Sequence, residues 1–260
     1  MIIDQVNSHV SSILLWNYGE PFLNKELVRM MRYAVNRGMY VMTSTNGQFF
    51  RSREFLRELV ESGLHDIIVS CDGADQPTLS KFRAGCQFDA IVDGLRFLYA
   101  AKKELDSSFP RVTFQFIVMK HNEHQREKMK RLAQDLHVDI YYEKTVDIDG
   151  EDLRFQDMAK ELLPKDLTFS RYSPGRGGNF SLKGNLHNHC SWVYRTVVIN
   201  SDGTVVPCSY DRYSRYIMGN AFRESIEMIW NSEKYRSFRR MIASGRKSLP
   251  VCQACPEGRG

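Results

Sequence analysis

The chain carries an apolar run, Ser12-Ile13-Leu14-Leu15-Trp16-Asn17-Tyr18, which is followed by an amphipathic segment over residues 24–36. The run predicts a buried strand, and the segment predicts a helix because its apolar residues recur at helical spacing. The alternation continues, with strands expected over residues 40–45, 66–70, 111–119 and 138–143, and helices over residues 53–61, 89–105 and 123–136. Strands that alternate with helices predict βαβ units and a parallel sheet.

Polar clusters follow these predicted strands. They are Asn17-Tyr18-Gly19-Glu20-Pro21, Ser44-Thr45-Asn46-Gly47, Ser70-Cys71-Asp72-Gly73 and Lys120-His121-Asn122-Glu123. Ligands of parallel α/β sheets bind at the carboxyl ends of the strands. We therefore expect a binding site at this edge of the sheet.

The alternation stops near Asp147. Residues 147–186 are polar and glycine-rich, and we expect them to form a connector. Further on, two β-rich runs flank Ser201-Asp202-Gly203, which predicts a hairpin, and a last helix is expected from Ser225 to Ile242. The sequence thus divides into residues 1–146, 147–186 and 187–260.

Four cysteines occur in the C-terminal region, at Cys190, Cys208, Cys252 and Cys255. The last two form a C-x2-C pair, whose thiolates can reach the same ion or cluster. Soft thiolate ligands select zinc or iron–sulfur clusters, so the pattern predicts a four-thiolate site. His187 and His189 keep zinc open as the occupant. Cys71 and Cys86 have no partners at ligand spacing and are expected to be core or incidental cysteines.

Composition narrows the class of protein. The chain has 260 residues, 42% hydrophobic and 26% charged, which is typical of a folded protein. No apolar run approaches the roughly 18 residues of a membrane span, and the start lacks the pattern of a signal peptide, so we expect a cytoplasmic protein. The net charge of +5 is a mild excess of scattered basic residues, which does not favour nucleic-acid binding.

The motifs resemble those of the radical SAM enzymes that carry a C-terminal SPASM or shorter "twitch" iron–sulfur domain. Asn17-Tyr18-Gly19-Glu20-Pro21 is similar to the family's G-G-E-P motif, with Tyr18 in place of the first glycine. Ser70-Cys71-Asp72-Gly73-Ala74, with Arg83-Ala84-Gly85 after it, resembles S-x-D-G-A…R-x-G. Cys190…Gly203-x4-Cys208…Cys252-x2-Cys255 is similar to the SPASM opening, closed by a single C-x2-C as in twitch domains.

This resemblance implies roles for individual residues. Glu20, with the Gly19 backbone, would receive the methionine ammonium of S-adenosylmethionine, and Arg83 would pair with its carboxylate. Ser70 and Asp72 would lie near the ribose hydroxyls, and Thr45 and Asn46 would line the same edge. The four C-terminal cysteines would hold one auxiliary [4Fe-4S] cluster. The sequence assigns no catalytic residue.

One departure from the family concerns its first cluster. The family's C-x3-C-x2-C loop, which holds the cluster that cleaves S-adenosylmethionine, does not occur in the sequence, and residues 2–9 resemble the end of the first barrel helix. Either the sequence is a truncation or the gene has lost this part. We therefore expect a partial (β/α)6 TIM-like barrel without its first βα unit, plus a small α+β SPASM/twitch-like domain. This chain alone should not generate the 5′-deoxyadenosyl radical, and a second [4Fe-4S] cluster requires an N-terminal segment.

The function implied by the resemblance is a radical SAM oxidoreductase or maturase. It would abstract hydrogen from a peptide or small-molecule substrate, with an electron-donor protein as a further partner. Two other functions stay open. One is a non-catalytic iron–sulfur-binding relic or peptide-binding partner subunit, and the other is a zinc-stabilised α/β binding module. Metal analysis separates the cluster from zinc.

Overall fold

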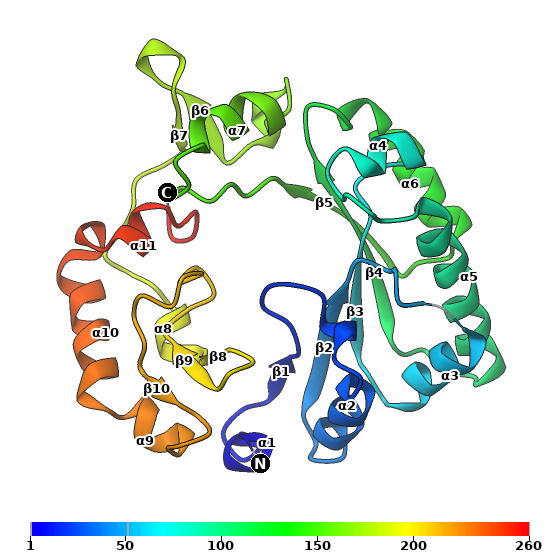
Figure 1. Ribbon diagram of the computed structural model, residues 1–260, viewed down its shortest axis with the longest axis horizontal. Helices are drawn as coiled ribbons and strands as arrows, with labels where there is room; N and C mark the ends of the chain where they lie inside the picture. Colours follow the sequence, from blue (N-terminus) through cyan, green and yellow to red (C-terminus); the bar gives the residue numbers. More distant parts are fainter. Residues whose placement is uncertain (1, 51, 260) are drawn as a thin grey trace. The chain divides into compact units, whose positions relative to one another are not determined.

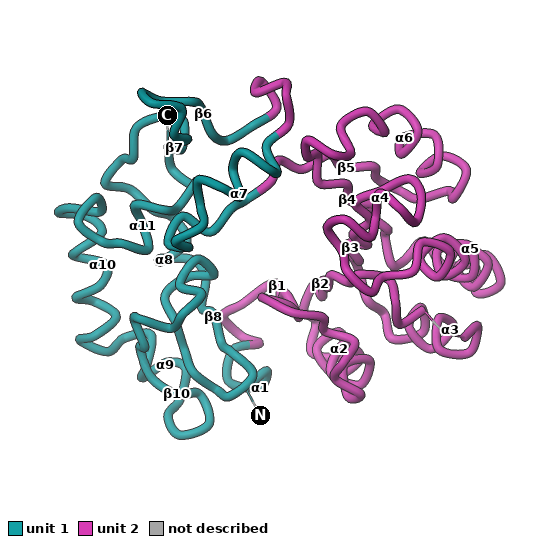
Figure 2. Tube along the Cα trace, turned by 45° about the horizontal axis from the view of Figure 1, so that its top comes forward, with its two compact units in different colours: residues 1–6, 147–163, 170–260 teal, residues 7–146, 164–169 magenta. Residues whose placement is uncertain are grey.

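The computed structural model describes residues 2–50 and 52–259, and the chain divides into two compact units (Figure 2). Residues 7–146 and 164–169 form one, here called the sheet unit. Residues 1–6, 147–163 and 170–260 form the other, here called the cysteine unit. The segment expected to be a connector therefore belongs mostly to the cysteine unit.

The sheet unit is built on a five-stranded parallel sheet, with the strands in chain order (Figure 1). The strands are β1 (Ser12–Leu14), β2 (Tyr40–Thr45), β3 (Asp66–Ser70), β4 (Arg111–Val118) and β5 (Ile140–Thr145). The helices between them are α2 (Leu27–Val35), α3 (Arg53–Glu61), α4 (Gln76–Ser80), α5 (Phe88–Glu104) and α6 (Arg126–Asp135). The expected partial TIM-like barrel is confirmed in this unit.

The helices of the sheet unit lie along one face of the sheet, as Figure 1 shows. Right-handed crossovers between strands in sequential order place every helix on the same side. Alternate residues of β4, among them Phe114 and Phe116, are fully buried on that face. Their neighbours Gln115 and Ile117 are only half-buried on the opposite face. The second face is therefore the one on which a ligand could be received.

An ion pair joins the starts of three strands at the amino-terminal edge of the sheet. Arg111 donates to both oxygens of Asp66, at 2.8 and 3.1 Å, and Tyr40 donates its hydroxyl to the same carboxylate. Burial alone would raise the pKa of the Asp66 carboxyl. The hydrogen bonds from Arg111 and Tyr40 outweigh burial and hold this pKa below its usual value.

Asp66→Asn should therefore make the stability of the protein less dependent on pH. Because the pKa of the Asp66 carboxyl is lower in the folded than in the unfolded state, its ionisation stabilises the fold at pH values above the unfolded pKa of about 4. This stabilisation is lost as the pH falls through the folded-state pKa. The free energy of unfolding of the variant should lie about 1 kcal/mol below wild type at pH 7, and the two should converge near pH 2. Urea unfolding across this range measures it. Glu58→Gln, at an exposed site 4.0 Å from Arg32, is the control, and parallel pH curves for wild type and Asp66→Asn would contradict the prediction.

The cysteine unit contains short elements and two small antiparallel sheets, β6–β7 and β8–β9–β10. Its strands are β6 (Tyr172–Pro174), β7 (Phe180–Leu182), β8 (Val198–Ile199), β9 (Thr204–Val206) and β10 (Gly219–Asn220). Its helices are α1 (Ile2–Val6), α7 (Phe155–Leu162), α8 (Trp192–Arg195), α9 (Ile226–Trp230), α10 (Glu233–Gly245) and α11 (Pro250–Gln253). The first and ninth helices are tied together because Gln5 Oε1 accepts the Ile226 N–H at 2.9 Å.

The structure differs from the sequence expectations at several elements, and the expected connector itself contains helix α7 and the β6–β7 hairpin. The strand expected over residues 12–18 ends at Leu14, and Gly19 follows with a left-handed φ of +83°. The helix expected from Ser225 to Ile242 is two helices, because Ser232 adopts an extended backbone and caps a new start by accepting the Tyr235 N–H. Helix α4 was not expected, although Asp75 caps it by accepting the Thr78 N–H. Among the helices of residues 2–50 and 52–259, none combines the length and the hydrophobicity of a membrane-spanning segment.

Candidate functional site

Glu20 follows β1, and its carboxylate accepts hydrogen bonds from residues at the carboxyl end of β2. One oxygen of its carboxylate accepts the Phe22 N–H at 3.1 Å and the Thr45 hydroxyl at 2.9 Å, and the other accepts the Asn46 N–H at 2.7 Å. A carboxylate has about four acceptor positions, so capacity for one more donor remains. The side chain is half-buried and could still receive a ligand ammonium.

Gly19, Thr45 and Asn46 lie beside this carboxylate and differ in what they can offer a ligand. Thr45 is 3% exposed and gives its hydroxyl hydrogen to Glu20, so it stabilises the strand ends. Asn46 accepts the Gln48 N–H at 3.0 Å in a local turn. Gly19 is exposed, and its left-handed backbone turns the chain toward Glu20. Of these three, Gly19 presents the most accessible backbone.

Asp72 lies inside the sheet unit rather than on its surface. Its side chain is completely buried, and its two oxygens accept the Ile117 N–H at 2.7 Å and Arg83 Nε at 2.6 Å. Arg83 keeps 20% of its side chain exposed. Ser70 is also buried and accepts a hydrogen bond from Gln115 at 3.2 Å. The structure thus brings Asp72 and Arg83 together as a pair and leaves the arginine as the accessible member.

The amide side chains of Asn122 and Gln125 hydrogen-bond to the loop that follows β3. Asn122 is fully buried, donates to the carbonyls of Asp72 and Ile117, and accepts the Met119 N–H. Gln125 accepts the Ala74 N–H at 2.7 Å. The sequence did not single out Gln125, because nothing in its neighbourhood indicates that it reaches the S-C-D-G-A loop. Both amides order the loop and are not placed to meet a ligand.

Gly73→Ala should destabilise the protein strongly. A Cβ atom at Gly73 would lie 2.4 Å from the Leu79 amide nitrogen, which belongs to helix α4 and cannot move like a side chain. We expect a loss of about 2–3 kcal/mol in the free energy of unfolding, measured by urea denaturation. Gly245→Ala is the control, since the atom nearest to its new Cβ, the Ser248 hydroxyl oxygen, would be 3.8 Å away. Equal stability of the two variants would overturn the prediction.

The four C-terminal cysteines line one cavity of the cysteine unit. Cys190 precedes helix α8, Cys208 follows β9, and Cys252 and Cys255 lie in and just after helix α11. The cavity is walled by Trp192, Val193, Phe238, Ile242 and Val251, together with Tyr210, Arg246 and Glu257. Four soft donors on largely apolar walls suit an iron–sulfur cluster.

Hydrogen bonds reach the cysteine sulfurs from the surrounding chain. The Glu257 N–H donates to Cys255 Sγ at 3.4 Å, and the backbone of Tyr210 and Asp211 donates to Cys208. Burial raises the pKa of Cys208 to about 12 and that of Cys255 to about 11. These thiols are neutral at pH 7, so ligand binding there must release protons.

Arg246 is a member of this site that sequence reasoning missed. It is 1% exposed, and its Nη2 lies 3.5 Å from Cys255 Sγ while Nη1 donates to the His189 carbonyl at 2.8 Å. Burial opposes its charge, but the hydrogen bond to Cys252 and the nearby thiols leave the pKa of Arg246 raised. Nothing in the sequence marks it among 36 lysines and arginines, because its position depends on tertiary packing.

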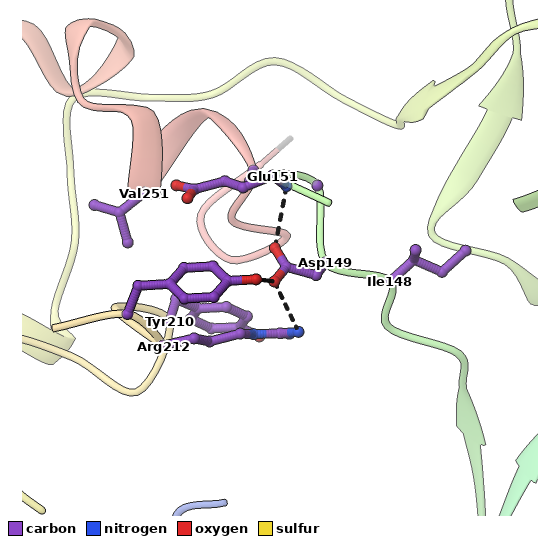
Figure 3. A pocket seen from close by; sticks show the side chains of 9 residues that line it. Ile148, Asp149, Glu151, Tyr210, Arg212 and Val251 are labelled. Carbon is purple, nitrogen blue, oxygen red and sulfur yellow. Dashed lines mark hydrogen bonds and ion pairs between the residues drawn. The ribbon is translucent and has the colours of Figure 1, made fainter. Parts of the chain in front are cut away.

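A second, smaller pocket of the cysteine unit borders the C-x2-C turn (Figure 3). Asp149 accepts the Tyr213 hydroxyl at 2.8 Å and pairs with Arg212 at 3.8 Å, and Arg215 pairs with Glu151 at 2.7 Å. A Cβ atom at Gly150 would lie 2.8 Å from that of Ala254, so this loop packs directly on the turn. The acidic residues are neutralised by arginine and brace the cysteine site.

The remaining cysteines, Cys71 and Cys86, belong to the sheet unit and are not among the residues that line the cavity. Cys71 is fully buried and Cys86 is 7% exposed, as expected for core cysteines. Within residues 2–50 and 52–259, no three Cys, His, Asp or Glu side chains converge closely enough to hold a single metal ion.

Models of known protein families match both the N-terminal and the C-terminal part of the chain. The radical SAM superfamily model matches residues 2–133, and the SPASM model, an iron-sulfur cluster-binding domain, matches residues 190–256. The chain therefore belongs to the radical SAM superfamily and carries a SPASM domain at its C-terminal end. S-adenosylmethionine and iron–sulfur clusters are the cofactors of this combination.

Curated relatives cover most of this chain at low identity. It is 25% identical over 271 residues to a tungsten-containing aldehyde ferredoxin oxidoreductase cofactor-modifying protein of Pyrococcus furiosus, covering 91% of this chain and 71% of that one. It is 25% identical to an AdoMet-dependent heme synthase of Methanosarcina barkeri, over 91% and 73%. A match to the Fe-coproporphyrin III synthase of the same organism is 36% identical but spans 37% of this chain and only 27% of the relative.

Solved structures share the fold. SuiB of Streptococcus suis bound to S-adenosylmethionine aligns with a TM-score of 0.64 and 15% identity, over 99% of this chain and 64% of that one. Native anSMEcpe with bound AdoMet aligns with a TM-score of 0.62 and 14% identity, over 99% of this chain and 78% of that one. At these identities the likeness concerns the fold alone.

Proposed function

We propose that this chain acts as part of a radical SAM oxidoreductase or maturase that abstracts hydrogen from a peptide or small-molecule substrate. The observation that carries the proposal is the cavity lined by all four C-terminal cysteines, in a chain of this superfamily. We propose Cys190, Cys208, Cys252 and Cys255 as ligands of one auxiliary [4Fe-4S] cluster. When bound, S-adenosylmethionine and the iron–sulfur clusters supply the hydrogen-abstraction and electron-transfer chemistry.

The sheet unit would bind and orient S-adenosylmethionine at its strand ends. Glu20 retains acceptor capacity for the methionine ammonium, and the exposed Gly19 backbone lies next to it. Arg83 would receive the methionine carboxylate with the nitrogens that do not bond Asp72. The burial of Ser70 and Asp72 favours an indirect role for them, in which they hold Arg83 and the loop in place.

The substrate class and partners are proposed by analogy with relatives. Relatives of this chain include a heme synthase and a cofactor-modifying protein, and SuiB has been solved with its precursor peptide SuiA. These names span small molecules and peptides, so we propose one of these two classes as substrate. An electron-donor protein would supply the reducing equivalents.

Metal and ligand analysis tests the proposal. After anaerobic reconstitution with iron and sulfide, the chain should hold about four iron and four sulfide per molecule. About one zinc per chain without sulfide would support the zinc-stabilised module instead. Millimolar S-adenosylmethionine should slow amide hydrogen exchange over residues 19–22 and 45–48. Cluster loading without such protection would support the non-catalytic relic or partner subunit.

Glu20→Gln separates S-adenosylmethionine binding from cluster loading in that experiment. The glutamine amide keeps one acceptor oxygen, so it can accept from Thr45 or from the Asn46 N–H but not from both, and it no longer attracts an ammonium group. Protection by S-adenosylmethionine should therefore weaken while cluster loading is unchanged. Glu26→Gln, at an exposed glutamate of the same unit, should leave both properties unchanged.

A further inference from the structure

Arg246 carries a buried positive charge that has no carboxylate partner within residues 2–50 and 52–259. Among the described residues its contacts are the His189 carbonyl at 2.8 Å, the thiols of Cys255 and Cys252, and, for its backbone N–H, Asn188 at 3.0 Å. Its Nε is buried and donates to no acceptor in the part of the chain that the structure describes. A buried cation of this kind is costly unless a negative charge lies near it.

The guanidinium is held in the cavity by packing. It is 1% exposed, so its nitrogens cannot reach bulk water. Gly258, with a left-handed φ of +67°, runs against it, and a Cβ there would lie 2.6 Å from Arg246 Nη1. Both Arg246 and the four cysteines line the same cavity. The charge is therefore fixed next to the sulfurs.

A four-thiolate iron–sulfur cluster would supply the missing negative charge. The cluster with its thiolates is anionic, and each added electron makes it more so. Net charge and hydrogen bonds to the sulfurs are among the factors that set the potential of such a cluster. Arginine stays protonated at any pH of interest, so its charge is permanent.

We propose that Arg246 is a positioning and charge-compensating residue that raises the reduction potential of the auxiliary cluster. This inference rests on the proposed function of the four cysteines. The reaction concerned is a one-electron reduction of the cluster in which no bond to Arg246 forms or breaks. The fixed positive charge and the N–H donors favour the reduced, more negative state.

An EPR-monitored redox titration of the reconstituted full chain, with dithionite as the electron source, tests the proposal. At a fixed potential, Arg246→Met should lower the ratio of reduced to oxidised cluster at least tenfold, which corresponds to about 59 mV for a one-electron couple. Arg246→Lys keeps the charge but loses the planar fork, so it should fall between wild type and Arg246→Met. Arg236→Met, which removes an exposed charge from helix α10, should change the ratio less than twofold.

The outcomes separate this inference from the proposed function. A wild-type chain that binds no iron and sulfide overturns both. A loaded Arg246→Met protein with an unchanged potential overturns only the role of Arg246.

If neither Arg246→Met nor Arg246→Lys retains the cluster, a measurement on the wild-type protein tests the same inference. Protein labelled with 15N-arginine should show a 15N coupling to the reduced cluster by pulsed EPR. The coupling should persist in labelled Arg259→Lys, which removes the arginine that donates to the Cys255 carbonyl. Absence of the coupling in wild type would overturn the inference.

Discussion

Cys255→Ser is expected to remove the auxiliary cluster. Cys255 is 5% exposed and lies at the end of the C-x2-C turn that lines the cavity with Cys190 and Cys208. Iron content after reconstitution should fall from about four to below about one per chain, because a serine hydroxyl is a poor ligand for a soft site. Iron and sulfide assays on the purified, desalted protein measure the loss.

The same variant should lose stability as well as iron. Binding free energy at a structural thiolate site contributes to folding, so the cysteine unit of Cys255→Ser should unfold at a lower temperature than the loaded wild type. Cys86→Ser is the matched control, since it changes a buried thiol of the sheet unit. Full iron content in Cys255→Ser, or equal loss in Cys86→Ser, would exclude the proposed ligand set.

Asp72→Ala should lower the free energy of unfolding by about 3 kcal/mol. Removal of the carboxylate leaves the Ile117 N–H and the Arg83 guanidinium without their buried acceptor. This loss in the free energy of unfolding is small for the removal of one partner of a buried ion pair, because the Arg83 side chain is 20% exposed and can hydrogen-bond to water instead. Urea unfolding followed by far-UV circular dichroism measures it.

A double-mutant cycle then assigns the effect to the pair. Asp72→Ala combined with Arg83→Met should be less destabilised than the sum of the single variants, because no unpaired charge remains. Asp93→Ala, which removes an exposed carboxylate near Arg96, should change stability by less than about 0.5 kcal/mol. If Asp72→Ala were as mild as Asp93→Ala, the prediction that the buried pair stabilises the sheet unit would be wrong.

The sequence predicted the secondary structure correctly where its hydrophobic periodicity was strong. Helix α3 and strand β3 were predicted with the bounds that the structure gives, because each is a short amphipathic or apolar segment with clear turn signals. Helix α4 was missed although Asp75, Pro77 and Thr78 form a capping signal. The break between α9 and α10 depends on Ser232, whose capping role is hidden inside a continuous helical pattern.

The sequence predicted only part of the candidate site. The cysteine pattern alone grouped Cys190, Cys208, Cys252 and Cys255 in one four-thiolate site, and the structure brings all four to the same cavity. Burial could not be predicted for Asp72, because a polar residue after a strand is equally compatible with a ligand contact or an internal ion pair. Arg246 could not be found, since its neighbours at the cavity come from residues far apart in the chain.

The order in which the units can be completed during synthesis follows from how the chain is shared between them. The sheet unit needs residues only up to 169, whereas the cysteine unit combines residues 1–6 with residues up to the C-terminal end. Gln5 cannot receive the Ile226 N–H until the ribosome has made and released most of the polypeptide. Helix α1 therefore cannot gain this contact while the residues of the sheet unit are being synthesised, whereas the sheet unit already has all its residues after residue 169.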